Sequence, residues 1–136
     1  NLQIIKSLNH KISFNMLYFI LNYRSVFGCV DFLKGMGFHN NSFIIGALLQ
    51  PDYLNIRHLP DSVLDSLKTI LDEKIAEHPG FLLENSYRNM LQYISIPIEK
   101  DLANSFEQIR ILDARRNVDS KKIFTDLYTN GSLHIT

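Results

Sequence analysis

Two prolines, Pro51 and Pro60, bound the segment that most constrains how this chain of 136 residues can fold. A proline fixes its own φ angle, lacks a backbone N–H, and disfavours the helical conformation in the residue before it. A long helix or an inner strand is therefore not expected to continue through either end of the segment. Strand and helix patterns precede Pro51, whereas only helical patterns follow Pro60. We expect residues 51–60 to connect an α/β region to a helical region.

The region before Pro51 has the apolar pattern of a strand, a helix and a second strand. Residues 11–18 alternate between apolar and polar, which is typical of a half-buried strand. Residues 24–36 show helical spacing, and residues 43–49 are almost continuously apolar, as in a strand buried on both faces of a parallel sheet. Because the connections are short, these segments predict a βαβ unit with a right-handed crossover. The expected buried face of the first strand consists of Ile12, Phe14, Met16 and Tyr18.

Four helices are expected after Pro60. They are predicted over residues 61–78, 84–94, 98–116 and 119–127. Asp61 is a suitable N-cap for the first of them, and Pro79 followed by Gly80 cannot continue it. The expected organisation is a βαβ segment over residues 1–60, a helical region over residues 61–128 and a polar, frayed tail over residues 129–136.

The composition is that of an ordinary globular protein, with 46% hydrophobic and 21% charged residues. The formal net charge is +0, so there is no bulk electrostatic attraction to nucleic acid or to an anionic membrane surface. No signal peptide or membrane span is visible, because the apolar runs are short and polar residues interrupt them. We therefore expect neither a nucleic acid nor a membrane as a partner.

The single cysteine, Cys29, excludes an internal disulfide framework and an all-cysteine metal site within this chain. A reducing, cytoplasmic location is the simpler expectation. The neighbours Phe27, Val30 and Phe32 are apolar, which favours a buried structural thiol over a nucleophile at Cys29.

No set of side chains has the spacing of a catalytic or metal-binding site, and we assign no catalytic residue. The five histidines are scattered singly, so a metal site made from this chain alone is not expected. The acidic residues Asp72, Glu73 and Glu77 fit a solvated helix face better than a carboxylate pair for acid–base catalysis. Asn15 allows two interpretations: an amide satisfied at a sheet edge, or a ligand-facing residue near the carboxyl end of a barrel strand.

Two short parts of the chain carry a resemblance to a known family. Residues 51–60 read Pro-Asp-Tyr-Leu-Asn-Ile-Arg-His-Leu-Pro, and residues 112–117 read Leu-Asp-Ala-Arg-Arg-Asn, with Phe-Thr-Asp-Leu at residues 124–127. They resemble the C-terminal part of radical S-adenosylmethionine proteins with a twitch domain. In that family a late barrel strand is followed by a proline–aromatic–leucine–asparagine–isoleucine run and a Leu-Pro pair that opens a helix. This chain departs from the family at Thr125 and Asp126, where Pro-Glu is usual, and it lacks the CxxxCxxC motif that binds the iron–sulfur cluster.

The resemblance implies an α/β fold: the last βα units of a partial, TIM-like barrel, followed by a helical C-terminal region. It also implies a [4Fe-4S] cluster and S-adenosylmethionine, whose reductive cleavage yields a 5′-deoxyadenosyl radical, in a full-length protein that supplies the cysteines upstream. Asn15, Tyr53 and Asn55 would be the candidates for cofactor or substrate contact at the barrel mouth. Since the chain starts with Asn1 rather than methionine, the expected partners are an upstream part of the same polypeptide and a substrate, either a peptide or a small molecule.

A non-catalytic, α-rich protein-interaction domain is the alternative, because the chain contains no self-contained catalytic set. The apolar run of residues 43–49 favours the first hypothesis. A purely helical adaptor has no need for a strand of this kind.

Overall fold

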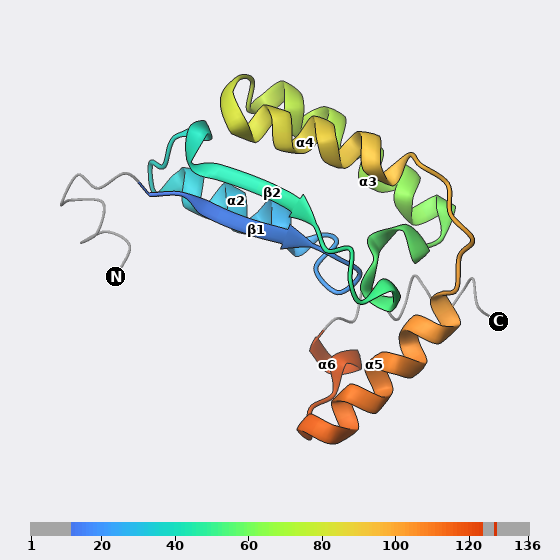
Figure 1. The fold of residues 1–136 in the computed structure, drawn as a ribbon. Coiled ribbons are helices and arrows are strands. Elements are labelled where there is room, and N and C mark those ends of the chain that lie inside the picture. The colour runs from blue at the N-terminus through green and yellow to red at the C-terminus, as the bar shows by residue number, and fades with distance from the viewer. Residues whose placement is uncertain (1–11, 124–126, 128–136) are drawn as a thin grey trace.

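In the computed structural model, which describes residues 12–123 and residue 127, a parallel pair of short strands lies in the first half of the chain (Figure 1). Strand β1 (Phe14–Tyr18) pairs with strand β2 (Phe43–Ala47), so that the first residues of the two strands lie side by side, as do the last. Helix α2 (Ser25–Gly35) connects them. The predicted strand–helix–strand order in a mixed α/β fold is therefore confirmed, with shorter strands than expected.

Four helices follow in the described part of the chain. They are α3 (Asp61–Glu77), α4 (Phe81–Ile94), α5 (Leu102–Arg116) and α6 (Ser120–Ile123). None of the described helices has both the length and the apolar character needed to cross a membrane. The predicted end of the last helix falls on residues of which only Leu127 is described, and the predicted tail, residues 129–136, lies outside the described residues.

Two predicted helix starts are wrong, and local hydrogen bonds explain both shifts. Helix α3 begins at Asp61 as predicted, but Asp61 is its first helical residue, and Pro60 rather than Asp61 occupies the N-cap position. Helix α4 begins three residues earlier than predicted because the N–H of Gly80 donates to Oε1 of Glu84 over 3.0 Å, which satisfies a donor at the helix entrance. Helix α5 begins four residues later than predicted, where Oδ1 of Asp101 accepts a hydrogen bond from the N–H of Asn104.

The segment bounded by Pro51 and Pro60 consists of two consecutive 3₁₀ turns, η2 (Asp52–Leu54) and η3 (Ile56–His58). Asn55 stands between them, and its Oδ1 accepts a hydrogen bond from the N–H of Arg57 at 3.0 Å. The peptide bond before Pro51 is cis. As predicted, no α-helix or strand continues through the segment.

The core lies between one face of the sheet and the helices that pack on it. Phe14 stacks on Phe43 with ring centroids 5.6 Å apart, and Phe27 of α2 meets Tyr87 of α4 at 5.9 Å. Buried side chains from both strands and from α2, α3, α4 and α5 belong to a single hydrophobic cluster. Residues 12–60 and the helices after them therefore share a core in the described structure.

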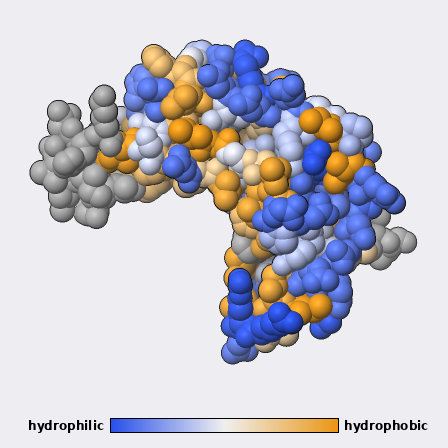
Figure 2. All heavy atoms as spheres, viewed as in Figure 1, coloured by the Kyte–Doolittle hydropathy of each residue, from blue (hydrophilic) through white to orange (hydrophobic). Residues whose placement is uncertain are grey.

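The opposite face of the sheet is open to solvent, which corrects the prediction that the second strand is buried on both faces. Ile44 is 46% exposed on β2, and Leu17 is 54% exposed on β1. In Figure 1, α2 lies behind the strands and no helix covers their front, and Figure 2 shows apolar side chains on the surface seen from this side. An apolar run predicts burial on both faces, but the described residues cover only one face of this sheet.

Cys29 is exposed, so the prediction of a buried structural thiol is wrong. Helix α2 buries the stripe formed by Val26, Phe27, Val30 and Leu33. At 3.6 residues per turn, Cys29 lies roughly a quarter of a turn away from the centre of that stripe.

Candidate functional site

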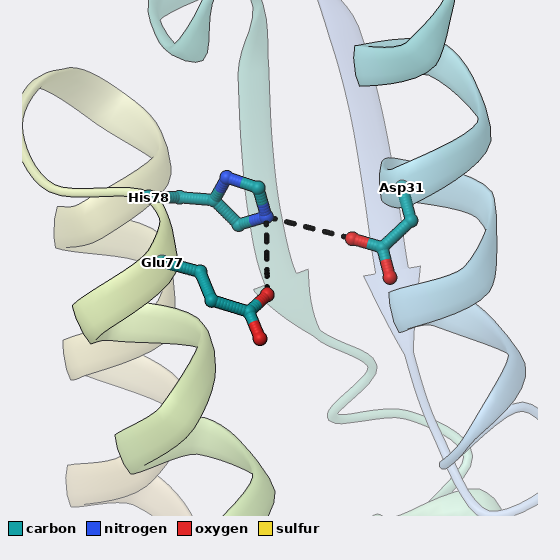
Figure 3. Close-up of side chains that lie close together, drawn as sticks. All are labelled: Asp31, Glu77 and His78. Atoms are coloured by element: carbon teal, nitrogen blue, oxygen red, sulfur yellow. Dashed lines mark ion pairs between the residues drawn. The ribbon is translucent and has the colours of Figure 1, made fainter.

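Four charged or polar side chains from two helices meet at one end of the described core. Asp31 comes from α2, Lys74 and Glu77 come from the last turn of α3, and His78 is the residue that ends α3. We call these four residues the α2–α3 charge cluster. Figure 3 shows the imidazole of His78 between the carboxylates of Asp31 and Glu77. One ligand atom from each of these three residues lies within 4.8 Å of the other two.

Lys74 and His78 both lie close to the carboxylates of Asp31 and Glu77 in the α2–α3 charge cluster. Nζ of Lys74 lies 2.6 Å from Oδ2 of Asp31 and 3.3 Å from Oε2 of Glu77. Nε2 of His78 lies 3.5 Å from Oδ1 of Asp31 and 3.8 Å from Oε2 of Glu77. These last distances are too long for good hydrogen bonds, and Nε2, although shielded from solvent, has no hydrogen-bond partner among the described residues. Oδ1 of Asp31 thus faces His78 while Oδ2 binds Lys74.

Electrostatic effects follow from this arrangement. Burial opposes the charged form of Lys74, but hydrogen bonds and the charges of Asp31 and Glu77 outweigh it and raise the pKa of the ammonium group. Burial also raises the pKa of the Tyr87 phenol, and the negative charges of Asp31 and Glu77 raise it further. Tyr87 is fully buried, and its hydroxyl has no hydrogen-bond partner within the described structure.

Sequence reasoning did not find the α2–α3 charge cluster. Asp31 and His78 are far apart in the chain, and Glu77 was assigned to a solvated helix face. The backbone of His78 leaves the helical conformation, with φ of −126° and ψ of 62°. The side chains of adjacent residues within a helix point in different directions. Because α3 ends at His78, the imidazole of His78 can turn toward the carboxylate of Glu77. Pro79 signals the end of the helix at His78, but nothing in the sequence indicates that Asp31 of α2 lies beside it.

The candidates Asn15, Tyr53 and Asn55 occupy different environments. Asn15 is exposed on β1, in register with Ile44, on the uncovered face of the sheet. Tyr53 is partly buried in η2. Asn55 is 3% exposed.

The amide of Asn55 is engaged in a small polar cluster after the carboxyl end of β1. Its Nδ2 donates to the hydroxyl of Tyr93 over 2.6 Å, while its Oδ1 accepts the hydrogen bond from Arg57. The guanidinium of Arg57 lies over the Tyr93 ring at 4.3 Å, and the ring of Tyr18, the last residue of β1, meets Tyr93 edge-on at 6.2 Å. These contacts give Asn55 a structural role in joining the proline-bounded segment to α4.

A hollow lies beside His58, between the starts of α3 and α5. The charged groups that line this hollow already form ion pairs or hydrogen bonds with other residues of the chain. Nζ of Lys100 lies 3.2 Å from Oδ1 of Asp61, and both ring nitrogens of His58 have partners, Asp52 and the backbone of Asp101. The hollow therefore offers little unmatched charge to a ligand.

Comparison of the chain with protein-family models, curated proteins and solved structures finds no match.

Proposed function

We propose that this chain forms the last βα units and the helical cap of a larger α/β barrel of the radical S-adenosylmethionine type. The observation that carries the proposal is the uncovered face of the β1–β2 sheet. Parallel sheets are normally covered on both faces, and two strands are seldom stable alone. Here Leu17 and Ile44 stand exposed on one face. Such a sheet needs further strands and a filled second face to be stable.

The edges of the sheet indicate where further strands would join. The N–H of Ile45, on the outer edge of β2, donates to Oγ of Ser86 over 3.0 Å, so α4 occupies that edge. Within the described residues, no strand pairs with the other edge of β1. We therefore place additional strands beside β1. If that sheet curves into a partial barrel with β2 at its edge, the face that carries Asn15, Leu17 and Ile44 becomes its interior, because inward and outward residues alternate along barrel strands.

The residues of this chain do not fit a [4Fe-4S] cluster. The family motif supplies three cysteine thiolates, whereas this chain has Cys29 alone, exposed on α2. We assign no cluster ligand and no catalytic residue here. Under the proposal, an upstream part of the same polypeptide supplies the cysteines. Asn15 and Tyr53 remain the candidates for contact with S-adenosylmethionine or with a peptide or small-molecule substrate, while the amide of Asn55 is already engaged.

The complete gene product tests this proposal. A CxxxCxxC motif is expected in the sequence encoded upstream of Asn1. The anaerobically purified, reconstituted protein is expected to give the electron paramagnetic resonance signal of a reduced [4Fe-4S] cluster and to release 5′-deoxyadenosine from S-adenosylmethionine. Alanine at the three cysteines is the matched control and is expected to abolish both. A complete gene product without the motif, or without either signal, overturns the proposal.

The alternative, a non-catalytic α-rich interaction domain, predicts different behaviour of the 136-residue chain on its own. Most of the described residues are helical, and an independent domain would unfold cooperatively as a monomer. A piece of a barrel would instead self-associate through its open strand edge and the exposed Leu17 and Ile44. Light scattering coupled to size exclusion separates the two cases, and Leu17→Lys with Ile44→Lys is expected to reduce the self-association.

A further inference from the structure

We infer that Asp31, Glu77 and His78 form a binding site for a divalent transition-metal ion, with Zn²⁺ as the ion that best fits their chemistry. The site would take one ligand atom from each residue. An imidazole nitrogen with two carboxylate oxygens is a donor set that Zn²⁺ accepts, and three protein ligands leave a fourth position for water. This inference does not depend on the proposed function, because it uses none of the residues that the resemblance nominates.

The spacing of the donor atoms is close to what tetrahedral zinc requires. With zinc–ligand bonds of about 2.0–2.2 Å, two ligand atoms lie about 3.4 Å apart. Nε2 of His78 is 3.5 Å from Oδ1 of Asp31 and 3.8 Å from Oε2 of Glu77, and the three chosen donor atoms all lie within 4.8 Å of one another. Rotations of the partly exposed carboxylate side chains would bring the donors to the required distances (Figure 3).

Two buried polar atoms without a hydrogen-bond partner support a missing ligand at this place. Nε2 of His78 is shielded from solvent and faces both carboxylates without a hydrogen bond. The hydroxyl of Tyr87, on a fully buried side chain, also lacks a partner among the described residues, and the charges of Asp31 and Glu77 act on it. Buried polar groups are rarely left unpaired. A metal ion on Nε2 would give this nitrogen its missing partner.

Lys74 competes with the metal ion for the carboxylates of the site. Its Nζ lies 2.6 Å from Oδ2 of Asp31, the carboxylate whose Oδ1 faces His78. It also places a positive charge 3.3 Å from Oε2 of Glu77, one of the proposed ligands. With His78 neutral, two carboxylates and one ammonium give the α2–α3 charge cluster a net negative charge, which favours a cation. Removing the ammonium should therefore tighten metal binding.

Isothermal titration of the metal-free chain with Zn²⁺ tests the inference. One ion per chain is expected to bind, and His78→Gln and Asp31→Asn are each expected to weaken that binding at least tenfold. Lys74→Met is expected to bind Zn²⁺ more tightly than the unmodified chain. His39→Gln, which changes an exposed histidine outside the cluster, and Cys29→Ser, which removes the exposed thiol, are the matched controls and should leave the affinity unchanged.

Each variant is first compared with the unmodified chain by circular dichroism, and Asp31→Asn serves if His78→Gln does not fold. Three results would overturn the inference. They are the absence of stoichiometric binding, binding that survives in a folded His78→Gln or Asp31→Asn variant, and binding that Lys74→Met fails to tighten. Loss of binding in Cys29→Ser or His39→Gln alone would place the ion elsewhere and would also overturn it.

Discussion

The backbone N–H of Asp101 donates a hydrogen bond to Nδ1 of His58 over 2.9 Å. Because this nitrogen accepts, the ring proton is on Nε2, which lies 2.9 Å from Oδ2 of Asp52 and donates to it. His58 is buried, with 4% of the residue exposed. It thus connects the start of the proline-bounded segment to the N-cap of α5.

His58 is predicted to stabilise the junction between that segment and α5. In His58→Ala the N–H of Asp101 loses its acceptor in a partly buried place, so the free energy of unfolding should fall by about 1–3 kcal/mol. His58→Asn keeps an acceptor near the Nδ1 position and should recover part of the loss. Urea unfolding measures both, with His39→Ala as an exposed control. Equal losses in the two His58 variants would contradict the role assigned to Nδ1.

Tyr87, which is buried, and Tyr93, which is partly buried, are predicted to respond differently to loss of their hydroxyl groups. The hydroxyl of Tyr87 has no partner among the described residues, so in the metal-free chain Tyr87→Phe should leave the free energy of unfolding unchanged or raise it. The hydroxyl of Tyr93 accepts from Nδ2 of Asn55, so Tyr93→Phe should lower that free energy by about 1–3 kcal/mol. Denaturant titrations of the two variants test the difference. A loss of that size in Tyr87→Phe would mean that its hydroxyl is bonded in solution.

Ser86 is predicted to protect the outer edge of β2. Its Oγ accepts from the N–H of Ile45 in a buried place, over 3.0 Å. Ser86→Ala leaves that N–H without an acceptor and should cost about 1–3 kcal/mol of unfolding free energy. The exchange of the Ile45 amide hydrogen should also become faster. Ser66→Ala is the control, since Oγ of Ser66 donates to an exposed carbonyl of its own helix, and its effect should be small.

The α2–α3 charge cluster is predicted to make stability fall at alkaline pH. The folded structure raises the pKa of Lys74 above its usual 10.5, so it favours the ammonium form. This contribution is fully present below the unfolded pKa and is lost as pH rises through the folded pKa. Burial raises the pKa of Tyr18 and Tyr87 and acts in the same direction, because the unfolded chain releases these protons first.

Unfolding at pH about 8 and about 11, on either side of the usual lysine value, measures this dependence. Lys74→Met should show a smaller fall in stability between the two pH values than the unmodified chain. Lys68→Met removes a partly exposed lysine of the same helix, whose Nζ lies 3.6 Å from Oδ1 of Asp65, and serves as the control. An alkaline fall of the same size in Lys74→Met would contradict the contribution assigned to this ammonium group.

The elements of the fold were largely predictable, whereas several of their boundaries were not. Apolar periodicity is a local property, and it located β1, α2, β2 and the later helices. The start of α4 depends on the bond between Gly80 and Glu84, and the start of α5 depends on Asp101. A periodic pattern does not show which polar side chain will satisfy the first free N–H groups of a helix.

The prediction about Cys29 failed for a different reason. Apolar neighbours in the sequence suggested burial, yet the exposed thiol lies beside the buried stripe of α2 and not within it. Phe32, one of those neighbours, is itself 66% exposed. Which side of a helix faces the core depends on where the sheet lies, and this is a tertiary property.

By itself, the sequence determined the division of the chain at Pro51 and Pro60, because proline geometry acts on its own residue and on the residue before it. It also determined the order of strands and helices, since each apolar pattern lies within one segment. Only the tertiary structure decided that His58 bonds to Asp101, that Ser86 closes the edge of β2, and that Asp31 meets His78. Each of these contacts joins residues more than 40 positions apart in the chain, and their distance from one another is set by how the helices pack on the sheet.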